Sequence, residues 1–425
     1  MSDTLPLPLP GATRPATRPA HAAQTLFPVR DGCLQVGGIP LTRLAERVGS
    51  TPFYAYDRSL LDARVARLRA ALPAALRLHY AVKANPMPAL VQHMAGLVDG
   101  FDVASAGEMA VALDTGVAPG EISFAGPGKT DAELRRAIAA GVCLHIESEG
   151  ELARAAALGA ALGVRPLVAL RVNPDFELKG SGMRMGGGAK PFGIDAEQVP
   201  ALLRAMAAMA VEFRGLHIFS GSQSLKADAI IEAQARTFDL ALSLVEGTGL
   251  ALPQLNIGGG FGIPYFPGEQ ALALDAIGAH LAACCARLHA QRPETAVILE
   301  LGRYLVGEAG VYVARVTERK QSRGQVFLVT DGGLHHHLAA SGNFGQVIRK
   351  NYPVAIGNRM DETAARETVS VVGPLCTPLD VLAERMELAS ARAGDLVVVF
   401  QSGAYGRSAS PAAFLGHPAA AEVLV

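Results

Sequence analysis

The strongest constraint on the fold is a regular alternation of short apolar runs with longer Ala/Leu/Arg-rich stretches. The apolar runs are Leu78–Lys83, Gly100–Ala104, Ile122–Ala125, Cys143–Glu147, Leu167–Val172, Phe213–Phe219, Leu255–Ile257 and Val297–Glu300. The stretches of helical composition include Asp62–Ala71, Asp131–Ala140, Glu149–Leu162, Val199–Ala210 and Ala227–Glu246. Alternation of this kind predicts an α/β fold with a parallel sheet, and eight runs predict a closed (β/α)8 TIM barrel. An open doubly wound sheet is the alternative.

Polar and glycine residues follow the C-terminal ends of these runs. That edge of a (β/α)8 barrel carries the active site. The residues concerned are Lys83, Asp102, Ser105, Glu108, Arg171, Asn173, His217, Phe219, Ser222, Gly258, Gly259, Gly260, Glu300 and Arg303. The sequence therefore predicts a site at the C-terminal face of the barrel.

Three features at this face predict a cofactor. Burial of Lys83 at the end of its strand is expected to lower the pKa of the amine, which would make it a nucleophile towards an aldehyde. Gly258–Gly260 allows backbone N–H groups to approach an anion, and Arg303 adds positive charge. The Glu300 carboxylate is placed to keep a pyridine nitrogen protonated. An amine, an anion site and a carboxylate are what pyridoxal 5'-phosphate (PLP) requires.

Composition bounds the class of protein. The chain has 425 residues, half of them hydrophobic, which is enough for a large core and for two or three domains. The net charge of −1 gives no argument for binding nucleic acid or an anionic membrane. Five cysteines without metal-ligand spacing, and no signal-peptide pattern, predict a soluble cytoplasmic protein without a metal site.

Several motifs resemble those of the alanine-racemase-fold (fold type III) PLP-dependent decarboxylases, the family of the diaminopimelate, ornithine and arginine decarboxylases. The resemblance runs from about Leu34 to the C-terminus. It is carried by Tyr80–Asn85, Phe101–Ser105, Gly258–Phe261, Glu300–Arg303, Gly373–Cys376 and Gly403–Tyr405, which stand in the family's order.

The resemblance implies roles for individual residues. Lys83 would form the Schiff base with PLP, and Glu300 would pair with the pyridine nitrogen. The other residues implied in cofactor binding are Arg171, Phe219, Ser222, Gly258, Gly259, Gly260, Arg303 and Tyr405. Arg303, Asp331 and Thr377 are implied in substrate binding. Cys376 is implied as a catalytic acid that each subunit of a head-to-tail homodimer supplies to its partner.

The resemblance also implies a division into domains. Residues 51–300 would form the PLP-binding barrel, and residues 27–50 and 301–425 a β-rich domain of sandwich or barrel type. Strands of that domain are expected at Gly310–Val316, Gln325–Thr330, Glu367–Val372 and Asp395–Phe400. Residues 1–26 form a Pro/Ala-rich leader that is expected to be disordered, with a partner-binding tail as the alternative.

Departures from the family pattern bear on the substrate. Phe219 stands where relatives carry a histidine that stacks on the cofactor, and Thr377 stands where an acidic residue commonly faces a distal amine. The segment Asp331–Gln346 resembles the subgroup that decarboxylates a glutamyl thioester on a carrier protein, and the exosortase-associated decarboxylases. Its three histidines, His335–His337, are neighbours that rarely converge on a metal.

We therefore expect α-decarboxylation of a diaminopimelate-like amino acid or of a glutamyl group tethered to an acyl-carrier protein. Two alternatives remain at this stage. A racemase on the same fold would use a tyrosine where this chain has Cys376. A non-catalytic, decarboxylase-like regulatory protein would have lost Lys83 or the glycines, and both are present.

Overall fold

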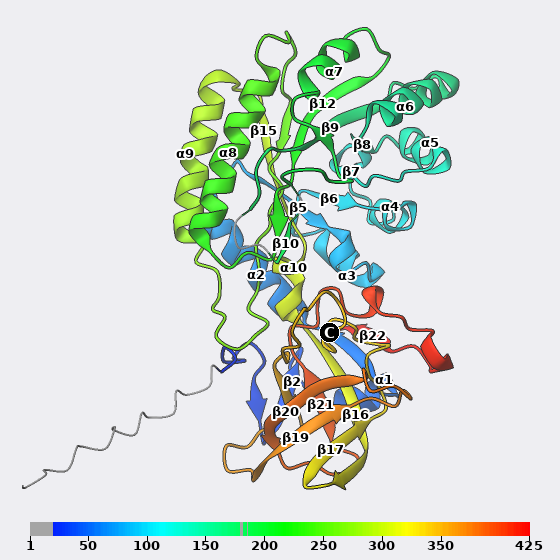
Figure 1. Ribbon diagram of the computed structural model, residues 1–425, viewed down its shortest axis with the longest axis vertical. Helices are drawn as coiled ribbons and strands as arrows, with labels where there is room; N and C mark the ends of the chain where they lie inside the picture. Colours follow the sequence, from blue (N-terminus) through cyan, green and yellow to red (C-terminus); the bar gives the residue numbers. More distant parts are fainter. Residues whose placement is uncertain (1–19, 179–181, 185) are drawn as a thin grey trace, which may run out of the picture.

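The computed structural model describes residues 20–178, 182–184 and 186–425 (Figure 1). A barrel with surrounding helices forms one end of the molecule, and a mixed β-sheet forms the other. Most of the leader lies outside the described residues. Its last part contacts the body of the protein through His21, whose Nε2 lies 2.8 Å from the carbonyl oxygen of Asn351. Within the described ranges, no helix is long and apolar enough to cross a membrane.

Eight parallel strands of the described chain close into a barrel. They are β5 (Arg77–Ala81), β6 (Gly100–Val103), β7 (Ile122–Phe124), β8 (Cys143–Ile146), β9 (Leu167–Asn173), β12 (Glu212–Ile218), β14 (Gln254–Asn256) and β15 (Ala296–Leu301). Each strand pairs with the next along the chain, and β15 pairs with β5 to complete the circle. The predicted barrel is confirmed, and the open sheet is wrong.

Helices surround the strands (Figure 1). They are α2 (Arg58–Ala71), α3 (Pro88–Met94), α4 (Ala106–Leu113), α5 (Asp131–Ala140), α6 (Glu149–Leu162), α7 (Val199–Met206), α8 (Ala227–Val245) and α9 (Asp275–Gln291). Local sequence explains several boundaries: α5 begins with a capping box between Thr130 and Glu133 and ends at Gly141 in the left-handed conformation.

The second domain is a mixed sheet. Its strands include β4 (Phe53–Tyr56), β16 (Gly310–Ser322), β17 (Gln325–Thr330), β18 (Val354–Ile356), β19 (Arg366–Val372), β20 (Val381–Ala389), β21 (Leu396–Val399) and β22 (Ala421–Leu424). A small sheet of β1 (Val29–Arg30), β2 (Cys33–Val36) and β3 (Ile39–Pro40) precedes α1 (Leu41–Val48). The four strands expected from sequence are present as β16, β17, β19 and β21.

Strand β4 corrects the expected boundary at residue 51. It pairs antiparallel with β16 and parallel with β22, so it belongs to the second sheet and not to the barrel. All four of its residues are buried. A buried apolar run indicates a strand but not its partner, so the sequence pattern could not correct the boundary that the resemblance implied.

The two domains meet beside Lys83. The amide of Tyr405 donates to the carbonyl of Ala84 at 2.8 Å, and Asn85 Nδ2 donates to the carbonyl of Gly403 at 3.0 Å. A Cβ on Gly403 would overlap the backbone of Val306, so only glycine fits there. This junction brings Tyr405 of the second domain to the mouth of the barrel.

Gly403→Ala is expected to disturb this junction, because the new methyl group would meet the backbone of Val306, which cannot move aside as a flexible side chain could. Overpacking of this kind costs about 1–3 kcal/mol. We expect a lower unfolding midpoint in thermal denaturation. Gly96→Ala is the control, because its Cβ would meet nothing closer than 3.6 Å. Equal midpoints for the two variants would contradict this account of the junction.

Candidate active site

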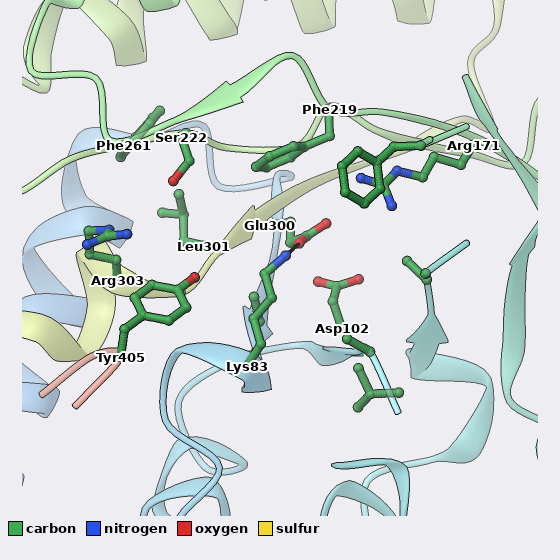
Figure 2. A pocket seen from close by; sticks show the side chains of 18 of the residues that line it. Lys83, Asp102, Arg171, Phe219, Ser222, Phe261, Glu300, Leu301, Arg303 and Tyr405 are labelled. Atoms are coloured by element: carbon green, nitrogen blue, oxygen red, sulfur yellow. Dashed lines mark ion pairs between the residues drawn. The ribbon is translucent and has the colours of Figure 1, made fainter. Parts of the chain in front are cut away.

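A cavity of about 380 Å³ opens at the C-terminal ends of the barrel strands (Figure 2). Eight of the predicted cofactor-binding residues line it: Lys83, Arg171, Phe219, Ser222, Gly260, Glu300, Arg303 and Tyr405. Asp102 on β6, also expected at this face, lines it as well. Strands distant in sequence thus bring the predicted groups into one cavity, as a (β/α)8 barrel requires.

Lys83 lies in a short 3₁₀ turn, η1 (Val82–Ala84), directly after β5. Its side chain extends into the cavity and is 42% exposed. The amine nitrogen Nζ lies 3.7 Å from Oε1 of Glu300 and 5.6 Å from the centre of the Phe219 ring. The amine is therefore accessible from the cavity and paired with a carboxylate.

The expected fall in the pKa of Lys83 is wrong. Burial lowers the pKa, but the negative charge of Glu300 and, to a smaller extent, Tyr405 outweigh it, so the pKa of Lys83 is raised. The sequence argument counted desolvation alone. An opposite charge at this distance stabilises the ammonium form, and here it decides the sign.

Glu300 lies on β15 and is buried. Its Oε2 lies 3.2 Å from Nε2 of His217, and neither atom makes a well-aligned hydrogen bond among the described residues. Burial raises the pKa of Glu300, but the contact with His217 and the positive charges of Lys83 and Arg171 lower it by more. The pKa of Glu300 is therefore below its usual value. Glu300 is therefore an ionised carboxylate with capacity for another donor.

Gly258–Gly260 is fixed by close packing. Gly258 and Gly260 have positive φ angles of 66° and 80°. A Cβ on Gly258 would lie 2.6 Å from Cδ2 of Phe219, and one on Gly260 would lie 2.5 Å from the carbonyl oxygen of Gly221. Only glycine suits such positions. Gly260 lines the cavity, whereas Gly258 and Gly259 pack behind it.

Arg303 supplies positive charge beside these glycines. The guanidinium donates from Nη1 to the hydroxyl of Tyr265 at 3.0 Å, and its carbon lies 4.6 Å from the centre of the Tyr405 ring. Its Nε is buried and has no hydrogen-bond partner in the part of the chain that the structure describes. A guanidinium held on one side and free on another is suited to binding an anion.

Arg171 is held by a residue that the sequence analysis did not single out. Its Nη1 donates to Oε1 of Glu147 at 2.7 Å, and both side chains are buried. The amide of Gly193 donates to the other oxygen of Glu147 at 3.0 Å. Glu147 ends an apolar run that carries no other signal of this role, so only the fold reveals the pair.

These observations fit PLP. The free capacity of Glu300 suits a protonated ring nitrogen, and the unpartnered Nε of Arg303 suits a phosphate. The glycine segment reaches the cavity at Gly260, where its backbone can approach an anion. Lys83 supplies the amine.

Three of the predicted catalytic and substrate-binding residues lie outside this cavity. Cys376 is exposed, and neither it nor Thr377 lines the cavity of its own chain. Asp331 is held in the second domain, where it accepts the amide of Arg315 at 2.8 Å and the hydroxyl of Thr51. The structure therefore gives Asp331 a contact between β-strand segments in place of the expected contact with substrate.

The three histidines pack inside the second domain, where the ring centres of His335 and His336 lie 3.7 Å apart. Nε2 of His336 lies 2.7 Å from the carbonyl of Pro418, and Nε2 of His337 lies 2.9 Å from Oγ of Ser402. All three side chains are buried in the second domain. They pack the segment that follows β17.

Comparison with known proteins identifies the family. Residues 58–307 match the model of the pyridoxal-dependent decarboxylases, pyridoxal binding domain. The chain therefore belongs to the pyridoxal-dependent decarboxylases. It is an enzyme that uses PLP, and its activity is decarboxylation, in agreement with the sequence-based prediction.

Relatives cover nearly the whole chain. An L-glutamyl-[BtrI acyl-carrier protein] decarboxylase from Niallia circulans is 39% identical over 389 residues, which is 90% of this chain and 90% of the relative. A diaminopimelate decarboxylase from Pseudomonas aeruginosa is 34% identical over 390 residues, 89% of each. The structure of a diaminopimelate decarboxylase from M. jannaschii with L-lysine has a TM-score of 0.86 and 26% identity. The match covers 95% of this chain and 93% of the solved one.

Glu300→Gln is expected to lower the pKa of Lys83, because burial then acts without the opposing carboxylate charge. Loss of this opposite charge removes the stabilisation of the ammonium form. The measurement is the pH dependence of amine modification at Lys83 in cofactor-free protein, read by peptide mass spectrometry. Lys226 is exposed and serves as the internal control. An unchanged profile at Lys83 would show that Glu300 does not set its pKa.

Proposed function

We propose that this enzyme removes the α-carboxylate of an amino acid whose far end carries no free ammonium, with a glutamyl group on an acyl-carrier protein as the preferred substrate. The observation that carries the proposal is the composition of the outer cavity wall. Its residues are Ala125, Gly126, Pro127, Phe192 and Phe344. Such a wall offers no carboxylate to a distal amine and suits a neutral linker.

The acidic groups of the cavity support this reading. Within the described chain, Asp102 and Glu300 are the acidic residues that line the cavity. Both extend from barrel strands, and Glu300 is engaged with Lys83 and His217. Thr377, at the position where the family commonly has an acid, is neutral. A second ammonium would therefore find no charged partner on the outer wall or at Thr377; the other carboxylate of the cavity, Asp102, lies on barrel strand β6.

The names of the relatives agree with this proposal in part. The Niallia circulans relative is named for a glutamyl group on an acyl-carrier protein, whereas other relatives are named diaminopimelate decarboxylases. The two substrates differ at the end remote from the reacting amino acid. A diaminopimelate-like substrate is therefore the alternative outcome of a substrate comparison.

Each site residue has a proposed task. Bound PLP supplies an aldehyde for the amine of Lys83 and an electron-withdrawing ring. Glu300 holds a proton at the ring nitrogen, which strengthens that withdrawal. Arg303, Tyr405, Ser222 and Gly258–Gly260 bind the phosphate. Phe219 packs against the ring, where it can stack but cannot donate a hydrogen bond. Arg171, fixed by Glu147, contributes positive charge at the cavity wall.

We further propose a homodimer in which Cys376 completes the site of the second copy and returns a proton to the substrate Cα. Cys376 is exposed and does not reach the cavity of its own chain. In the loops that hold Asn343 and Cys376, four large apolar side chains are exposed: Phe344, Val347, Ile348 and Leu379. The side-chain Nδ2 of Asn343 donates to the carbonyl of Leu379 at 3.3 Å, which joins the two loops that carry these side chains. Exposed apolar groups of this kind mark interaction surfaces.

A cytoplasmic location is also proposed. All five cysteines are free thiols, which is typical of proteins in a reducing compartment.

The substrate proposal is tested by measuring carbon dioxide release from diaminopimelate, ornithine, arginine, lysine, free glutamate and a carrier-protein glutamyl thioester. We expect kcat/KM for the carrier-bound substrate to exceed the others by about tenfold or more, because apolar contacts and the lack of an unpaired ammonium both favour it. Preference for diaminopimelate would contradict the proposal.

A matched pair of variants tests the wall itself. Phe344 and Phe414 are each 45% exposed, but only Phe344 lines the cavity. Phe344→Ser should reduce kcat/KM for the carrier-bound substrate, whereas Phe414→Ser should not.

The dimer proposal is tested by mixing two inactive variants, Lys83→Ala and Cys376→Ala. If sites are shared, one of the two sites in a mixed dimer has both native residues. After subunit exchange, about one quarter of native activity is expected for random C2 pairing. Sedimentation measures the dimer directly. Activity that does not rise on mixing, with exchange verified, would place Cys376 outside the shared site.

A further inference from the structure

Two buried histidines extend from Glu300 into the barrel, the first in contact with Glu300 and the second with the first. The chemistry described above does not use them. His145 is on β8, and His217 is on β12. Their Nδ1 atoms lie 2.9 Å apart, and Nε2 of His217 lies 3.2 Å from Oε2 of Glu300. Glu300, His217 and His145 therefore form a row of polar contacts that runs from the cavity into the barrel.

The short contact between the two Nδ1 atoms restricts the positions of the protons. Two N–H groups facing one another would clash, and two bare nitrogens would repel, so one proton lies between them. Glu300 is ionised and can only accept. A proton on Nε2 of His217 makes the contact with Oε2 of Glu300 attractive, whereas a bare Nε2 would repel that oxygen. If His217 carries a single proton, on Nε2, its Nδ1 is bare and the shared proton belongs to His145; a doubly protonated His217 would instead donate from Nδ1 to a bare Nδ1 of His145.

The surroundings of His145 support this assignment. Burial, the adjacent His217 and the positive charges of Lys129 and Arg171 hold the pKa of His145 well below its usual value, although Glu300 opposes them. His145 is therefore neutral, and with its proton on Nδ1 its Nε2 is an acceptor.

A neighbouring amide completes the pattern. His145 and Asn256 line the same small internal cavity. Oδ1 of Asn256 accepts the amide of Gly258 at 2.8 Å, which fixes the orientation of the side chain. Its Nδ2 is a buried donor without a hydrogen-bond partner in the described ranges. The residues that line this cavity thus include an amide donor without a partner, Asn256 Nδ2, and, in the assigned tautomer, an acceptor, His145 Nε2.

We propose that His145 and His217 are positioning residues that keep Glu300 charged and directed at the ring nitrogen of PLP, with His145 Nδ1–H donating to His217 and His217 Nε2–H donating to Glu300. The inference rests on the proposed role of Glu300. The function of His145 is to select the tautomer of His217. Without that donor, His217 is free to move its proton to Nδ1 and to leave Glu300 without a hydrogen bond from this side.

Three variants separate this role from simple packing. His145→Asn places an amide nitrogen where Nδ1 was and keeps a donor. His145→Leu has a similar volume but no donor. His79→Leu is the control for loss of a buried imidazole: His79 lies on β5, next to β15, and its ring nitrogens make no hydrogen bond to described residues, its Nδ1 lying 3.6 Å from Oδ1 of Asp102.

The first measurement uses the full chain without PLP and nitrogen-15-labelled histidine. NMR shifts distinguish the two neutral tautomers of each ring. We expect His217 as the Nε2–H tautomer and His145 as the Nδ1–H tautomer in the native protein. His145→Asn and His79→Leu should leave the His217 signal unchanged, and His145→Leu should convert it to a mixture. His217 as the Nδ1–H tautomer in the native protein would overturn the proposal, whether or not the Leu variant folds.

The second measurement uses the PLP-loaded protein and follows the visible absorption band with pH. A protonated ring nitrogen lowers the pKa of the nitrogen that links Lys83 to PLP. Loss of the proton on the ring should therefore raise the pH at the midpoint of the absorption change. His145→Leu should raise it by about half a unit or more, and His145→Asn should restore it. Equal shifts in His145→Leu and His79→Leu would assign the effect to packing and overturn the proposal. Failure of the native chain to bind PLP would instead contradict the proposed function, since the tautomers are read without PLP.

Discussion

The site depends on one carboxylate, Glu300, that stays ionised inside a barrel. Burial alone would neutralise it, since a charge removed from water is costly unless it is paired. Lys83, Arg171 and His217 reverse that tendency, and they come from different strands or strand ends. Closure of the barrel is what brings them together, because β15 pairs with β5 and places Glu300 in register with His79, four residues before Lys83.

The same charge explains an apparent conflict at Lys83. A nucleophilic amine needs a low pKa, yet Glu300 raises the pKa of Lys83 in the cofactor-free protein. In the proposed arrangement, a protonated ring nitrogen becomes the partner of Glu300, and the carboxylate's effect on Lys83 weakens. The pairing of Lys83 with Glu300 would then be a state of the protein before the cofactor binds, with the carboxylate already in the place where PLP needs it.

The barrel could be predicted from the sequence because its strands are buried on both faces. They are separated by helices with clear boundary signals, such as the capping box at Thr130. It also indicated Lys83, Glu300 and Arg303, since these stand at strand ends. It could not identify partners that depend on closure. Glu147 holds Arg171, and His145 contacts His217, yet each lies in an apolar run without a distinctive pattern. Strand β4 shows the same limit, since burial does not reveal which sheet a strand joins.

The position of covalent attachment tests the central claim most directly. The native protein is loaded with PLP, reduced with borohydride and digested, and the labelled peptide is identified by mass spectrometry. The account predicts a single pyridoxyl group on Lys83, because that amine lies in the cavity beside Glu300. A label on another lysine, such as Lys129, or PLP that binds without any reducible linkage, would contradict it.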